Sequence, residues 1–185
     1  LHQIAGWGVD TISGISFYEG SKYLGLVPGK VPKYRPIFVE DGDRVVPVPS
    51  ALLMSTSAEN VKRYWINLDK LRNDKRIFGD HSNLLEIFEL RQFIENLLLG
   101  TTSPVQYLSI SQPSSEGSTN KKLIFYLHSP LTIQLTDSGG NTTGLSSNGS
   151  VTENISGANY GRFGEVQYII APVGNYSLSL DGQSS

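Results

Sequence analysis

The density of charged side chains falls abruptly near Gly100, and this change constrains the fold more than any other feature of the sequence. Residues 1–100 carry 12 basic and 12 acidic side chains, whereas residues 101–185 carry only 3 and 5. Serine, threonine, asparagine and glycine take their place in the second half. A shift of this kind marks a domain boundary. We therefore expect two domains, 1–100 and 101–185, joined by a short linker at 100–104.

Strand and helix patterns alternate along the first half. The clearest helix lies between Ser82, a suitable N-cap, and Gly100, a suitable stop, because apolar residues recur there at helical spacing. Alternation of this kind predicts an α/β class, here the C-terminal portion of an α/β sheet. The other expected elements are a strand at 2–7, a hairpin-like pair at 12–19 and 34–40, a helix at about 49–59 and a strand at 61–68.

The second half has no helical periodicity, and its short β-rich runs are separated by turn residues. This spacing predicts a small all-β sandwich of Ig-like type. The expected strands are 105–111, 121–128, 131–136, 149–155, 164–171 and 175–181. The side chains expected to point inward are Leu123, Phe125, Leu127, Ile133, Leu135, Val166, Tyr168, Ile170, Tyr176, Leu178 and Leu180.

Charge and composition exclude several classes of function. The net charge of -2 argues against a nucleic-acid partner and against a polybasic membrane patch. No apolar run reaches the roughly 18 residues that a transmembrane segment needs. The absence of cysteine removes disulfides, thiolate nucleophiles and cysteine-based zinc sites. Composition does not fix the compartment, and we favour an extracellular or cell-surface location.

The most conspicuous polar feature is the acidic turn Glu40-Asp41-Gly42-Asp43, which follows an expected strand. A calcium loop of the EF-hand type would need further oxygen ligands, but Arg44-Val45-Val46-Pro47 comes next. The histidines, at positions 2, 81 and 128, are too dispersed for a metal site. We therefore expect neither a metal nor a cofactor.

Asp43 and His81 are the candidate catalytic residues. In α/β-hydrolases the order along the chain is nucleophile, acid and histidine, and these two residues could supply the acid and the base. Asp41 and Asp80 are rival acids by position. A capping or surface role for His81 is the alternative, and we expect His2 and His128 to be packing residues.

Three segments resemble motifs of the lecithin:cholesterol acyltransferase family: "AGWGVDTISGISFYEG", "FVEDGDRVVPVPSAL" and "GDHSNLLEIFEL". The resemblance covers about residues 2–99. It implies a serine α/β-hydrolase whose triad acid is Asp43 and whose base is His81, acting as a lipid or acyl-ester hydrolase or an O-acyltransferase. The missing cysteines suggest a bacterial or archaeal relative, and the sandwich resembles an accessory module of microbial hydrolases.

The nucleophile of such an enzyme is not found in this sequence. No G-x-S-x-G motif occurs, and the glycine spacing around Ser16 does not match a nucleophile elbow. We expect the serine and the oxyanion hole upstream of Leu1, so the N-terminal remainder of the hydrolase domain is an expected partner, beside a lipid or acyl-ester substrate. The 185 residues alone are then expected to be inactive.

Two alternatives remain open at this stage. The chain could be a non-catalytic binding or structural module whose sandwich recognises a glycan, a peptide or a cell surface through exposed aromatic residues. The candidates for that role are Tyr107, Tyr126, Tyr160 and Phe163. It could also be part of a nicked enzyme whose N-terminal fragment stays bound, because an incomplete sheet would leave an exposed edge.

Overall fold

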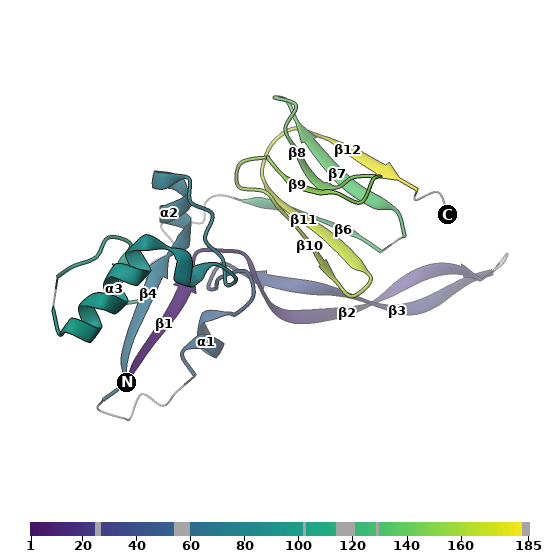
Figure 1. Ribbon diagram of the computed structural model, residues 1–185. Helices are drawn as coiled ribbons and strands as arrows, with labels where there is room; N and C mark the ends of the chain where they lie inside the picture. The colour runs from purple at the N-terminus through teal and green to yellow at the C-terminus, as the bar shows by residue number, and fades with distance from the viewer. Residues whose placement is uncertain (25–26, 54–59, 102, 114–120, 129, 183–185) are drawn as a thin grey trace. The chain divides into compact units, whose positions relative to one another are not determined.

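The chain forms two compact units, Leu1–Glu116 and Gly117–Ser185 (Figure 1). The computed structural model describes residues 1–24, 27–53, 60–101, 103–113, 121–128 and 130–182. The described residues between 101 and 116, which were expected to begin the second domain, group with the first unit.

The first unit contains a three-stranded sheet and a separate two-stranded hairpin. The sheet has the order β1-β4-β5, in which β1 and β4 run parallel and β5 is antiparallel to β4. The hairpin consists of β2 and β3, which pair with each other and with no other strand of the described residues. The elements are β1 (His2–Trp7), β2 (Thr11–Leu24), β3 (Val27–Val39), α1 (Val48–Ala51), β4 (Lys62–Asn67), α2 (Leu68–Lys75), the 3-10 turn η1 (Leu84–Glu86), α3 (Phe88–Leu99) and β5 (Leu108–Ser109).

The predicted α/β class is wrong. Strands far outnumber helical segments among the described residues, and most of the paired strands are antiparallel. The sheet of the first unit is small and mixed, and it is not an α/β-hydrolase sheet. The order of strands and helices along the sequence does not reveal which strands pair, and here the two longest strands form a hairpin outside the sheet.

Helix boundaries in the first unit also differ from the prediction. The helix expected at 49–59 ends at Ala51, and residues 54–59 lie outside the described part of the chain. Helix α2 was missed, although the Asn67 side chain caps it by accepting from the Lys70 N–H at 2.8 Å. Ser82 is not an N-cap, because α3 begins six residues later. Gly100 ends α3 with a left-handed φ of 68°, as predicted.

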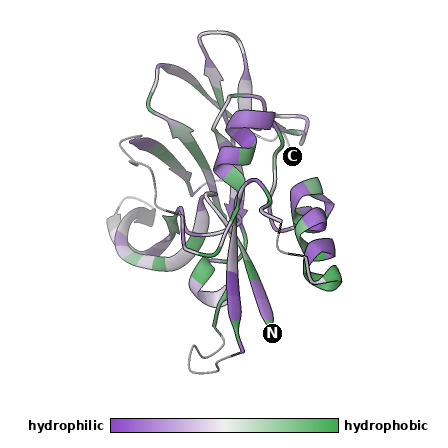
Figure 2. Ribbon diagram, turned by 90° about the vertical axis from the view of Figure 1, so that its left-hand side faces the viewer, coloured by the Kyte–Doolittle hydropathy of each residue, from purple (hydrophilic) through white to green (hydrophobic). Residues whose placement is uncertain are grey.

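Both faces of the β1-β4 pair are covered by apolar side chains. Residues that lie opposite each other in paired strands point to the same face, so Ala5 and Trp65 share one face. The helices of the unit carry interspersed polar and apolar residues, as expected for helices with one buried side (Figure 2). One core joins Ala5, Trp7 and Trp65 to Val48 and Leu52, and the other joins Val9 and Ile66 to Leu68, Leu71, Ile87 and Leu90.

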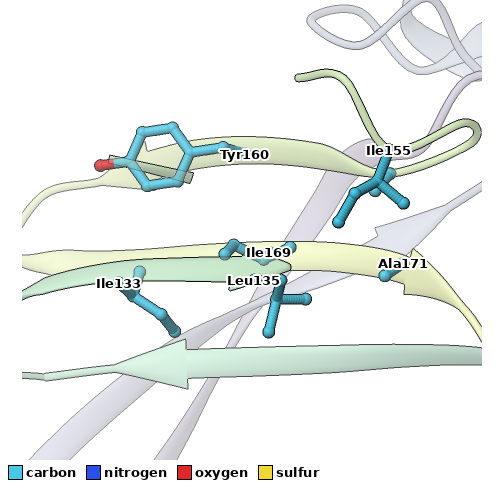
Figure 3. Close-up of a cluster of buried hydrophobic side chains, with 7 residues drawn as sticks. Ile133, Leu135, Ile155, Tyr160, Ile169 and Ala171 are labelled. Carbon is cyan, nitrogen blue, oxygen red and sulfur yellow. The ribbon is translucent and has the colours of Figure 1, made fainter. Parts of the chain in front are cut away.

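The second unit consists of two antiparallel sheets that share one core, which is consistent with a β-sandwich. Their strand orders are β10-β11-β6 and β12-β7-β8-β9. Side chains from both sheets meet in the core (Figure 3), which contains Ile133, Leu135, Ile155, Ala158, Tyr160, Ile169 and Ala171. The strands are β6 (Lys122–Leu127), β7 (Thr132–Asp137), β8 (Thr142–Leu145), β9 (Val151–Glu153), β10 (Asn159–Phe163), β11 (Val166–Pro172) and β12 (Tyr176–Asp181).

The inward side chains were predicted correctly for β7 and incorrectly for β11. In β11 the core cluster contains Ile169 and Ala171, which belong to the face opposite Ile170. Because nearly every residue of β11 is buried, the alternation of apolar residues could not identify the core face. In β12, Tyr176 packs against the core, and Leu178 and Leu180 lie on the predicted face, opposite Leu135 and Ile133, although both leucines are nearly half exposed.

Candidate functional site

Asp43 and His81 are in direct contact. The Asp43 Oδ2 atom lies 2.9 Å from His81 Nδ1, and the Asp43 carbonyl oxygen accepts a second hydrogen bond, also 2.9 Å, from the backbone N–H of His81. The Asp43 residue is only 3% exposed, whereas the His81 side chain is 51% exposed. A buried carboxylate therefore holds one ring nitrogen of a histidine whose ring reaches the surface.

The other carboxylate oxygen of Asp43 is held by the backbone of its own loop. Its Oδ1 atom accepts hydrogen bonds from the N–H groups of Val46 at 2.7 Å and Val45 at 3.3 Å. Hydrogen bonds to an ionised acceptor are among the stronger ones in proteins. The two oxygens thus have separate partners, and Oδ2 is directed at the imidazole.

The loop that carries Asp43 is attached to the end of β1. Asp43 forms an isolated parallel bridge with Val9, and the Val9 N–H donates to the Gly42 carbonyl at 3.1 Å. The Gly8 N–H donates to the Glu40 carbonyl at 3.0 Å. The carboxyl ends of parallel strands are common places for functional groups. Asp43 was expected beyond such a strand, but its own preceding strand, β3, belongs to the hairpin.

Thr11 is a residue of the site that sequence reasoning did not assign. It is fully buried, and its hydroxyl donates to the Val9 carbonyl at 2.7 Å and accepts from the Arg44 N–H at 2.8 Å. Arg44 has a left-handed φ of 80°, a strained conformation for a residue with a side chain. The signal in the sequence was a threonine directly after a glycine-containing turn.

Two glycines allow the loop to lie close to its neighbours. A Cβ atom added at Gly6 would lie 2.6 Å from the Asp43 Cβ, and one added at Gly42 would lie 2.3 Å from the Thr11 hydroxyl oxygen. Both distances are too short for real side chains. Glycine is therefore required at both positions for Asp43 to reach its place.

The rival acids are engaged elsewhere. Asp41 accepts a hydrogen bond from the Trp7 indole at 2.6 Å. Asp80 accepts from the backbone N–H of Ser82 at 2.8 Å and lies 3.8 Å from Arg44. Burial acts to raise the pKa of the Asp80 carboxyl, but the bonds from Ser82 and the Arg44 charge outweigh it and hold this pKa below its ordinary value. Among the three candidate aspartates, Asp43 is the one bonded to the His81 ring.

The second ring nitrogen of His81, Nε2, is not the one that contacts Asp43. Within the described residues no hydrogen bond involves its Nε2 atom. Nearby positions in the sequence carry exposed apolar side chains, namely Val45, Phe78 and Leu85, each at least 60% exposed. An imidazole held at Nδ1 and open at Nε2 can accept a proton from a hydroxyl group brought to it.

The remaining two histidines belong to other elements of the chain. The His2 Nδ1 atom lies 3.2 Å from the Tyr64 hydroxyl, and the two rings stack. His128 follows β6 in the second unit. Over the described ranges, no group of three or more metal-ligating side chains gathers in one place.

The aromatic residues of the binding-module alternative are divided between the two units. Tyr160 is buried, and its hydroxyl donates to Gln167 in the core of the second unit. Tyr107 belongs to the first unit, where Lys75 lies 5.5 Å from its ring centre. Tyr126 lies on β6 and Phe163 on β10.

The chain has no match among protein-family models, among curated proteins or among solved structures. None of the helices in the described part of the chain is both long enough and apolar enough to cross a membrane.

Proposed function

We propose that Asp43 and His81 are the acid and the base of an acyl-transfer site in a lipid or acyl-ester hydrolase or O-acyltransferase. The observation that supports this is the hydrogen bond that the buried Asp43 carboxylate accepts from Nδ1 of the His81 imidazole, whose Nε2 atom is open. The same arrangement orients the histidine in serine-dependent acyl transfer. Exposed Val45, Phe78 and Leu85 suit an apolar acyl chain.

In this proposal each group has one task. A serine hydroxyl, supplied by polypeptide outside these 185 residues, attacks the ester carbonyl and gives its proton to His81 Nε2. Asp43 Oδ2 keeps the Nδ1–H bond and stabilises the imidazolium that forms. The proton then passes to the leaving alcohol, and water or an acceptor alcohol releases the acyl group.

The test is ester turnover by the full-length protein with a p-nitrophenyl acyl ester. We expect His81→Ala and Asp43→Asn each to lower kcat by roughly 10⁴-fold, the order of loss on removing a triad member. His128→Ala is the matched control and should stay near wild type. Wild-type turnover by His81→Ala would refute the proposal.

A second readout needs no nucleophile. In the 185-residue chain, proton NMR should show a downfield His81 Nδ1–H resonance that is lost in Asp43→Asn and kept in Asp41→Asn. This measurement separates a failure of the Asp43–His81 contact from a failure of the proposed chemistry.

A non-catalytic binding function is the second candidate, and less supports it. Tyr160, one of its aromatic candidates, is buried in the sandwich core. The proposed acid-base pair, by contrast, combines burial of one partner with exposure of the other.

A further inference from the structure

The β2–β3 hairpin has a charge opposite to that of the chain. Four of the five charged side chains in 11–39 are basic, although the chain as a whole has a net charge of -2. The single acid, Glu19, forms an ion pair with Lys30 at 2.7 Å. The hairpin therefore has a net positive charge, although the chain as a whole has a net negative charge.

One face of this hairpin presents apolar side chains to water. Phe17 lies directly opposite Tyr34, so the two side chains share a face with Ile15, two residues away. Phe17 is 74% exposed and Ile15 is 43% exposed. A two-stranded hairpin by itself is marginally stable in water, and packing of a face against another surface stabilises it.

The opposite face combines basic and aromatic side chains. Tyr18 lies opposite Lys33, and the Arg35 guanidinium lies 5.8 Å from the Tyr18 ring centre. Long lysine and arginine side chains can extend from one face toward a charged boundary while their alkyl parts cover apolar surface. Cations can therefore accompany the apolar face into an interface.

We propose that the β2–β3 hairpin docks on an anionic lipid surface. Ile15 and Phe17 enter the boundary between headgroups and acyl chains, and Lys33 and Arg35 meet the anionic headgroups. An acidic protein would satisfy the cations but would not require an exposed phenylalanine, so the combination favours lipid. This inference does not depend on the proposed acyl-transfer activity.

The test is sedimentation of the 185-residue chain with vesicles of phosphatidylcholine and phosphatidylserine, compared with vesicles of phosphatidylcholine alone. We expect binding to the mixed vesicles, weakened by added salt, and at least tenfold weaker binding to the neutral ones. Failure to bind the mixed vesicles would overturn the proposal.

Two pairs of variants separate the contribution of the apolar side chain to vesicle binding from that of the cations. Phe17→Ser should lower vesicle affinity about tenfold, whereas Phe88→Ser, which removes another exposed phenylalanine, should not. Lys33→Glu with Arg35→Glu should lower it by roughly fivefold or more per residue, whereas Lys70→Glu with Arg91→Glu, an equal charge change outside the hairpin, should have little effect. Circular dichroism and the thermal midpoint would verify that each variant is folded.

Three results would overturn the proposal. The first is equal loss of binding in hairpin and control variants, which would indicate general charge attraction. The second is unchanged affinity in Phe17→Ser, which would mean that no apolar side chain enters the lipid. The third is binding to polyglutamate but not to vesicles, which would indicate an acidic protein as the partner.

Discussion

The hydroxyl of Thr11 joins the start of β2 to the loop that carries Asp43, because it accepts a hydrogen bond from the Arg44 N–H at 2.8 Å. Thr11→Val would remove the hydroxyl that accepts from this partly buried N–H. We expect a fall of about 1–3 kcal/mol in the free energy of unfolding, measured with denaturant. Thr11→Ser keeps the hydroxyl and should lose less. A Thr11→Val protein as stable as Thr11→Ser would show that the hydroxyl does not support the loop.

Gly6 should not tolerate a side chain, because an added Cβ would lie 2.6 Å from the Asp43 Cβ. We expect Gly6→Ala to lower the free energy of unfolding by about 1–3 kcal/mol, as overpacking does, and to displace Asp43 from His81. Gly14→Ala is the control, because the nearest atom to its added Cβ lies 3.8 Å away. Denaturant unfolding and the His81 Nδ1–H resonance would measure the two effects, and similar results for both variants would contradict the prediction.

The ion pair between Lys75 and Glu89 should make stability depend on pH. Burial acts to raise the pKa of the Glu89 carboxyl, but the hydrogen bond and the charge of Lys75 outweigh it and hold this pKa below its ordinary value. A carboxyl whose pKa is lower in the folded state stabilises the fold above its unfolded pKa. That contribution disappears as the pH falls through the folded-state pKa.

Lys75→Met therefore should lower the thermal midpoint at neutral pH, and the difference from wild type should shrink as the solution becomes acidic. Thermal unfolding followed by circular dichroism between neutral and acid pH checks this. Lys70→Met changes an exposed lysine of the same helix and should give a small difference at every pH. A Lys75→Met difference that stays constant with pH would refute the pairing as its cause.

Leu135 and Leu178 should differ in their contribution to the second unit, although the sequence pattern placed both inward. Leu135 is fully buried and Leu178 is 49% exposed. We expect Leu135→Ala to cost about 2–5 kcal/mol of unfolding free energy and Leu178→Ala less than half as much. Denaturant unfolding of both variants checks this, and equal losses would show that β12 packs differently.

The contact between Asp43 and His81 was anticipated from their order along the chain and from the motifs around them. Their proposed roles stay predictions. The support around the contact was not anticipated, because Thr11 and Gly6 are distant in sequence and act through one hydroxyl and one missing side chain. Neither a single hydroxyl nor a missing side chain produces a periodic pattern in the sequence.

The fold was harder to predict than this contact. Apolar periodicity located most strands, and the hairpin-like pair at 12–19 and 34–40 was predicted, but the pattern does not show which strands share a sheet, so the separation of this hairpin from the sheet of the first unit was missed. The net charge of the whole chain was also a misleading guide to the charge of its surface. A sum over the whole chain averages the basic hairpin with acidic regions elsewhere, so it cannot exclude a local cationic surface.

His81 is tied to Asp43 twice, by its ring and by its own backbone N–H. The loop that carries Asp43 and the loop that carries His81 are thereby joined at these two residues. A displacement of the first loop would move the imidazole with it. Two contacts at different points of His81 therefore restrain the distance between the carboxylate and the ring.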